Sequence, residues 1–190
     1  MIEILRGSIL TLLMLNAVVS DLKYRKIPNR LTVTFALIGL GFHIITDFPQ
    51  GIFTSLLGFV VGFFIFLIPY LMKGMGAGDV KLMASIGAIT NWRTIISVGL
   101  YAAIAGGVIV LLLKIKSGGL KNTIVNTGKL LCHYFYGVMY SLTLLPTMKY
   151  NKDKYQLNLQ GKRDEYIPYA VAIAIGCIVS IILYPQGLSQ

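Results

Sequence analysis

Long apolar runs separated by short basic loops constrain this chain more than any other feature of its sequence. Residues 52–72 and 94–113 are each long enough to cross a bilayer as a helix, and neither run contains a charged residue. With 56% hydrophobic residues and a mean hydropathy of +0.75, the 190-residue chain is too apolar for a soluble domain of its size. Because backbone polar groups must be satisfied internally in lipid, the sequence predicts an all-α, polytopic helical bundle forming one membrane domain over residues 1–190.

About six spans are predicted. They cover residues 4–20, 31–46, 52–72, 80–90, 94–113 and about 167–184. The fourth would cover only roughly 16 Å of a hydrocarbon core about 30 Å thick. We therefore expect this short run to be a partial span or to be buried inside the protein.

The basic residues indicate the orientation of these spans. If residues 130–146 lie at the membrane interface, 15 of the 17 Lys and Arg residues are cytoplasmic, and only Arg6 and Arg93 are outside. If residues 130–146 span instead, the split becomes 10 to 7. We therefore predict both termini outside, residues 114–165 as a cytoplasmic or interfacial insertion before the last helix, and a multi-pass location in the cell (inner) membrane. The same topology explains the net charge of +10 without a nucleic-acid partner.

The cysteine and histidine pattern favours neither a metal site nor a disulfide framework. Cys132 and Cys177 lie in different apolar surroundings without CxxC spacing. His43 and His133 are isolated in the sequence, and we expect them to be packed rather than to ligate a metal. No cofactor is expected.

A glycine-rich break carries the first candidate functional residue. Gly74, Gly76 and Gly78 alternate just before Asp79, between two apolar segments. We expect these glycines to allow positive φ angles and close approach of other groups. An acid at such a break is a candidate functional residue. The alternative is that Asp79 only caps the next helix, by accepting hydrogen bonds from its first N–H groups.

A second acid, Asp21, ends the first predicted span and shares the cytoplasmic face with Asp79 in this topology. Two carboxylates within hydrogen-bond reach share one proton, so that one can donate to a carbonyl while the other takes a proton from water. Aspartic peptide hydrolysis requires this arrangement. We expect Asp79 to ionise more easily than Asp21 because it lies at a helix N-terminus, and Asn29 to be the N-cap of the second helix.

Three short motifs resemble those of the type IV prepilin peptidases, membrane aspartic peptidases of the GxGD class. They are Gly76-Ala77-Gly78-Asp79 followed by Val80-Lys81-Leu82, Asp21 followed by Ile27-Pro28-Asn29, and Ile167-Pro168-Tyr169. The resemblance implies a six-helix fold, no metal, and Asp21 and Asp79 as the catalytic pair. It also selects candidates for substrate binding or gating, which are Gly76, Gly78, Lys81, Pro28, Asn29 and Pro168.

The function that this resemblance implies is an aspartic endopeptidase. It would remove short basic leader peptides from pilin, pseudopilin or preflagellin precursors at the cytoplasmic membrane face. The implied partners are a substrate with an N-terminal hydrophobic helix and the lipid bilayer, and a homodimer is left open. Because the CxxC-containing domain of longer family members is not found in this sequence, no methyltransferase activity is expected. The alternative from another class is a small proton-coupled carrier that uses Asp21 and Asp79 as a proton relay.

Overall fold

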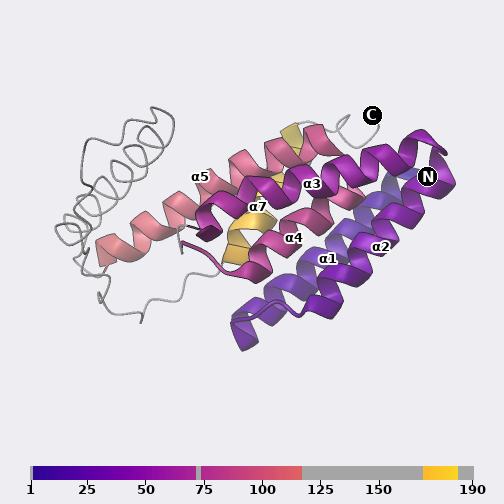
Figure 1. The fold of residues 1–190 in the computed structure, drawn as a ribbon. Coiled ribbons are helices and arrows are strands. Elements are labelled where there is room, and N and C mark those ends of the chain that lie inside the picture. The colour runs from indigo at the N-terminus through magenta and orange to yellow at the C-terminus, as the bar shows by residue number, and fades with distance from the viewer. Residues whose placement is uncertain (1, 72–73, 117–168, 184–190) are drawn as a thin grey trace, which may run out of the picture. The chain divides into compact units, whose positions relative to one another are not determined.

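The computed structural model describes residues 2–71, 74–116 and 169–183, and the regular secondary structure of this part is helical throughout. The helices are α1 (Ile2–Tyr24), α2 (Asn29–Thr46), α3 (Gln50–Leu71), α4 (Ala77–Ile89), α5 (Trp92–Lys116) and α7 (Tyr169–Leu183) (Figure 1). One compact unit comprises Met1–Ile109 and Ile167–Gln190. The second unit is Val110–Tyr166, of which only the end of α5 is described. The predicted all-α architecture is confirmed.

Four helices, α1, α2, α3 and α5, are long and apolar enough to cross a membrane. Their outward faces carry large exposed apolar side chains, among them Ile4, Ile45 and Phe53. Such faces suit contact with lipid tails. The segment 130–146 and most of the predicted insertion lie outside the described residues.

The first helix is longer than predicted, which changes the setting of Asp21. Helix α1 continues to Tyr24, so Asp21 lies in its last turn rather than just beyond it. The N–H of Arg25 donates to the Asp21 carbonyl at 2.8 Å, and Arg25 itself has a φ of 53°. A single left-handed residue of this kind is a common way to end a helix.

Helix α4 lies between α2 and α3 and is almost entirely buried. Ten of its 13 residues are buried, which explains how a helix too short to cross a bilayer can remain apolar. Lys81 and Ser85 contact the start of α2, whereas the end of α4 contacts His43 near the end of α2. Helix α4 therefore runs parallel to α2. The prediction that this run is buried inside the protein is confirmed.

Glycines allow α4 to approach its two neighbours closely. Gly58 of α3 and Gly87 of α4 meet backbone to backbone, and a Cβ on either would collide with the carbonyl oxygen of the other. A Cβ on Gly39 of α2 would lie 2.8 Å from the carbonyl oxygen of Ala88. Small residues at such crossings are typical of helix packing in membranes, where close van der Waals contact replaces the hydrophobic effect.

The C-terminal end of α4 is held by side chains of α2 and α3. Nε2 of His43 lies 2.9 Å from the carbonyl oxygen of Thr90 and 3.2 Å from that of Ile89. The hydroxyl of Ser55 donates to the carbonyl of Ala88 at 2.9 Å. These bonds satisfy carbonyls that a helix end leaves without intrahelical partners. The expectation that His43 is packed is confirmed, since it is buried; His133 lies outside the described residues.

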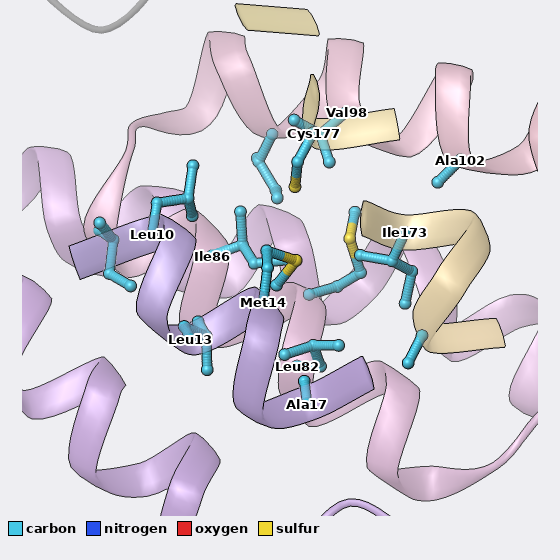
Figure 2. Close-up of a cluster of buried hydrophobic side chains, with 14 of the residues drawn as sticks. Leu10, Leu13, Met14, Ala17, Leu82, Ile86, Val98, Ala102, Ile173 and Cys177 are labelled. Atoms are coloured by element: carbon cyan, nitrogen blue, oxygen red, sulfur yellow. The ribbon is translucent and has the colours of Figure 1, made fainter. Parts of the chain in front are cut away.

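The hydrophobic core joins α1, α4, α5 and α7 (Figure 2). Helix α1 contributes one stripe of buried residues at helical spacing, which includes Leu10, Leu13, Met14 and Ala17 and ends at Asp21. Figure 2 shows the labelled side chains of this stripe gathered with those of α4, α5 and α7. The packing that buries this stripe therefore also fixes the direction in which Asp21 projects.

Candidate functional site

Asp21 is buried and faces the start of α7. Its side chain is 6% exposed, and its Oδ2 accepts a hydrogen bond from the N–H of Ala170 at 3.2 Å. Helix α7 begins at Tyr169, so the N–H of Ala170 is one of the first-turn donors that have no partner within their own helix. A hydrogen bond from such an N–H to a carboxyl oxygen is favourable because the N-terminus of a helix carries partial positive charge.

Asp79 is buried in the first turn of α4. Its side chain is 7% exposed, and its Oδ2 accepts a hydrogen bond from the N–H of Gly76 at 3.1 Å. The N–H of Asp79 in turn donates to the carbonyl of Gly76 at 3.2 Å. Asp79 thus closes the N-terminus of its own helix, as the capping alternative required. Only Oδ2 makes this bond, so a capping role for Asp79 does not exclude a chemical role for its carboxyl group.

The two carboxyls interact electrostatically. Helices α1, α4 and α7 contact one another pairwise, and Asp79 acts electrostatically on both Asp21 and Tyr169, the first residue of α7. Asp79 precedes the short run 80–90 and belongs to none of the four helices that could cross a membrane. Burial raises the pKa of Asp79 to about 6; the N–H of Gly76 opposes the rise, and the charge of Asp21 adds to it.

The rise in the pKa of Asp79 is opposite in direction to the helix-terminus effect on which the expectation that Asp79 ionises more easily than Asp21 was based. That expectation considered only the helix N-terminus, which favours the charged form. Removal of the Asp79 carboxyl from water acts in the opposite direction and is the larger effect here. A carboxyl with a pKa near 6 exchanges its proton close to neutral pH, which suits acid–base chemistry.

The glycines before Asp79 allow neighbouring groups to come close to the backbone, and they do not adopt positive φ angles. Gly76 has an extended backbone with φ −83° and ψ 154°, and neither Gly74 nor Gly78 has a φ in the left-handed region. A Cβ on Gly76 would lie 3.3 Å from Oδ2 of Asp79, and a Cβ on Gly78 would lie 3.2 Å from Cβ of Ile27. The prediction of positive φ was therefore wrong, and the prediction of close approach is confirmed for Gly76 and Gly78.

Two further candidates, Asn29 and Lys81, contact each other. Nζ of Lys81 donates to Oδ1 of Asn29 at 2.9 Å. Asn29 is the first residue of α2 and not its N-cap, because Pro28 occupies the N-cap position and the helix starts without a side-chain cap. The prediction for Asn29 was wrong because a distant lysine, and not the local backbone, binds its side-chain oxygen. Pro28 is exposed, and its carbonyl accepts from the N–H of Leu31 at 3.1 Å.

The structure shows further groups beside Asp21 that the sequence did not reveal. The N–H of Ala170 has no side-chain signature, although the Pro168 that precedes it is typical of a helix start. Pro168 itself lies outside the described residues. Ser20 adjoins Asp21 and donates from its hydroxyl to the carbonyl of Lys26 at 2.8 Å. Within the described ranges, no group of three or more His, Cys, Asp or Glu residues could hold a metal ion.

The fold and this site define a helical membrane protein with two buried, electrostatically coupled carboxyls where the end of one helix meets the starts of two others. The chain belongs to the type IV leader peptidase family, whose family model matches residues 8–111. That range includes both Asp21 and Asp79. The family resemblance expected from the sequence is confirmed.

Two curated relatives agree with this membership. A prepilin leader peptidase/N-methyltransferase of Myxococcus xanthus is 29% identical over 126 residues, which cover 61% of this chain and 36% of the relative. A preflagellin peptidase of Methanococcus voltae is 35% identical over 79 residues, which cover 40% of this chain and 34% of the relative. The chain thus spans about a third of the length of each of these relatives. No solved structure matches the chain.

Proposed function

We propose that this protein is a membrane aspartic endopeptidase that removes the leader peptide of prepilin-like or preflagellin-like precursors. The observation that carries the proposal is the pair of buried carboxyls, each accepting a backbone N–H bond at a helix N-terminus and acting electrostatically on each other. Family membership and the names of the relatives support a leader peptide as the substrate class. The active site would face the cytoplasm, because the positive-inside topology puts the end of α1 and the start of α4 on that side.

The proposed reaction uses the pair as one unit. The ionised carboxyl takes a proton from water while the water oxygen bonds to the carbon of the scissile carbonyl. The neutral carboxyl donates its proton to the carbonyl oxygen. When the tetrahedral intermediate collapses, that proton returns, the first carboxyl protonates the leaving amine, and the C–N bond breaks. The pair then holds one shared proton again.

Cleavage of a prepilin fusion by the pure protein in detergent tests this proposal. Asp21→Asn and Asp79→Asn should each abolish cleavage, because an amide can neither accept a proton from water nor complete the exchange of roles. The double variant should be no less active than either single variant, as expected for groups that act together. Cleavage should also persist in the presence of chelators.

The capping alternative makes the opposite prediction. Asn caps a helix about as well as Asp, so a residue that only capped α4 could be replaced by Asn with little effect. Substantial cleavage by Asp79→Asn would therefore exclude a catalytic role for this residue. Exposed Asp47 provides a matched control, and Asp47→Asn should cleave at the wild-type rate.

A further inference from the structure

The linker between α1 and α2 is folded back on the end of α1 that carries Asp21. The linker comprises residues 25–28, between Tyr24 and the first residue of α2. The hydroxyl of Ser20 donates to the carbonyl of Lys26 at 2.8 Å. Arg25 begins the linker with a φ of 53°, which is uncommon for a residue other than glycine. These features fix the path of the linker directly beside Asp21.

The same linker contacts α4 directly beside Asp79. Ile27 is 8% exposed and belongs to the hydrophobic core. Its Cβ would lie 3.2 Å from a Cβ built on Gly78, so only a residue without a side chain fits there without a shift. Gly78 immediately precedes Asp79. The linker therefore connects the two segments that carry the carboxyls.

Two side-chain hydrogen bonds continue this contact along α4. Nζ of Lys81 donates to Oδ1 of Asn29 at 2.9 Å, and the hydroxyl of Ser85 donates to the carbonyl of Thr32 at 2.8 Å. Gly78, Lys81 and Ser85 follow one another at helical spacing and lie along one face of α4. Ile27 of the linker thus contacts Gly78, while Asn29 and Thr32 of α2 contact Lys81 and Ser85.

The side chain of Lys81 contacts Asn29, the first residue of α2. Residues two apart in a helix do not face each other, so Lys81 and Asp79 lie on different faces of α4. The ammonium group of Lys81 is instead directed to the start of α2. This geometry differs from the substrate-binding role that the family resemblance suggested for Lys81 and Asn29.

We infer that Asn29 and Lys81 are positioning residues: their hydrogen bond ties the start of α2 to α4 and, through the linker, holds the end of α1 against the start of α4, which sets the separation of Asp21 and Asp79. This inference rests on the proposed function and deepens it. Two carboxyls share a proton only at hydrogen-bond distance, and a displacement of about 1 Å at a reacting group can lower a rate about a hundredfold. A bond outside the reacting groups can therefore control the rate.

Steady-state cleavage by four single variants and one double variant tests the inference. Asn29→Leu removes the acceptor at similar size and leaves the charge unchanged, whereas Lys81→Met removes the donor. Each should lower kcat about ten- to a hundredfold with little change in KM, and the double variant should be no slower than either single variant. Asn29→Asp keeps the acceptor and should recover most of the activity lost in Asn29→Leu. Lys23→Met removes an exposed lysine at the same end of α1 and should retain wild-type kcat.

A second readout does not depend on cleavage. The carboxyl signals of ¹³C-aspartate-labelled protein can be assigned with the Asp21→Asn and Asp79→Asn variants and followed with pH. Asn29→Leu should change the titration of Asp79, whereas Lys23→Met should not. If the wild type cleaves no precursor but the Asp79 titration changes in this way, the peptidase proposal fails and the positioning role stands.

Two results would overturn the positioning role itself. One is that the wild type cleaves the precursor and Asn29→Leu has the same kcat and the same Asp79 titration as the wild type. The other is a variant that yields less folded protein but has unchanged kcat per folded molecule, because the bond would then contribute only to stability.

Discussion

Replacement of Asp79 by Asn should stabilise the protein at neutral pH although it removes the proposed activity. Burial raises the pKa of the Asp79 carboxyl from an ordinary value of 3.8 to about 6. Since a tenfold change in proton affinity corresponds to about 1.4 kcal/mol, the ionised form costs about 3 kcal/mol in the folded state. Asn resembles the neutral acid in shape, and its side-chain oxygen can still accept the N–H of Gly76.

The sign of the pH dependence follows from this rise in pKa. The folded protein binds the Asp79 proton more tightly than the unfolded chain does, so the contribution of Asp79 to stability falls as the pH rises from about 4 to about 6 and does not fall further above that. Asn does not titrate. The free energy of unfolding of Asp79→Asn should therefore exceed that of the wild type by about 2–3 kcal/mol at pH 8, and by nearly nothing below about pH 4.

Equilibrium unfolding in mixed micelles, at pH 4 and at pH 8, measures this difference. Asp47→Asn is the control, because Asp47 is exposed and its replacement removes the same charge. The control should differ little from the wild type at either pH. A gain for Asp79→Asn that is equal at both pH values, or a loss at pH 8, would refute the argument that burial disfavours the ionised carboxyl.

Three further predictions concern the glycine before Asp79, the end of α4 and the topology. Gly78→Val should slow cleavage while the protein remains inserted, because its side chain would press on Ile27; wild-type turnover would count against close approach as the role of Gly78. His43→Ala should destabilise the protein by about 1–3 kcal/mol through the lost bonds to the carbonyls of Thr90 and Ile89, as measured by unfolding, and an unchanged midpoint would contradict this role. A cysteine placed at residue 152 should be labelled only from the cytoplasmic side in intact cells, and labelling from outside would overturn the predicted topology.

Much of the helical framework could be predicted from the sequence, because the lipid environment imposes strong local rules. A run such as 52–72 must form a helix to satisfy its backbone, and its length alone indicates a span. The burial of α4 was also predictable, since an apolar run too short for the bilayer needs protein around it. Helix ends were predicted less well, as at Asp21, because the end of a helix depends on capping geometry rather than on hydropathy.

The candidate pair could be named from the sequence, since acids are rare in this chain and, apart from Asp164 and Glu165 of the charged loop, only Asp21 and Asp79 adjoin predicted spans on the cytoplasmic face. Their surroundings could not be predicted in the same way. The donor to Asp21 is the N–H of Ala170, which is 149 residues away and carries no side-chain signal. Asn is a residue type that is preferred at helix N-caps, yet the side chain of Asn29 binds Lys81, 52 residues away. Contacts of this kind depend on how the helices pack together.

The ionisation of Asp79 shows the same division between local and tertiary effects. An acid after alternating glycines at a helix start can be read directly from the sequence, and this local arrangement favours the charged form. The packing of the helices reverses this preference. Helix α4 packs among α1, α2, α3 and α7, which removes the Asp79 carboxyl from water, and the end of α1 brings the Asp21 charge into range. Desolvation depends on every neighbour of a group in space, and most of these neighbours are distant in the sequence.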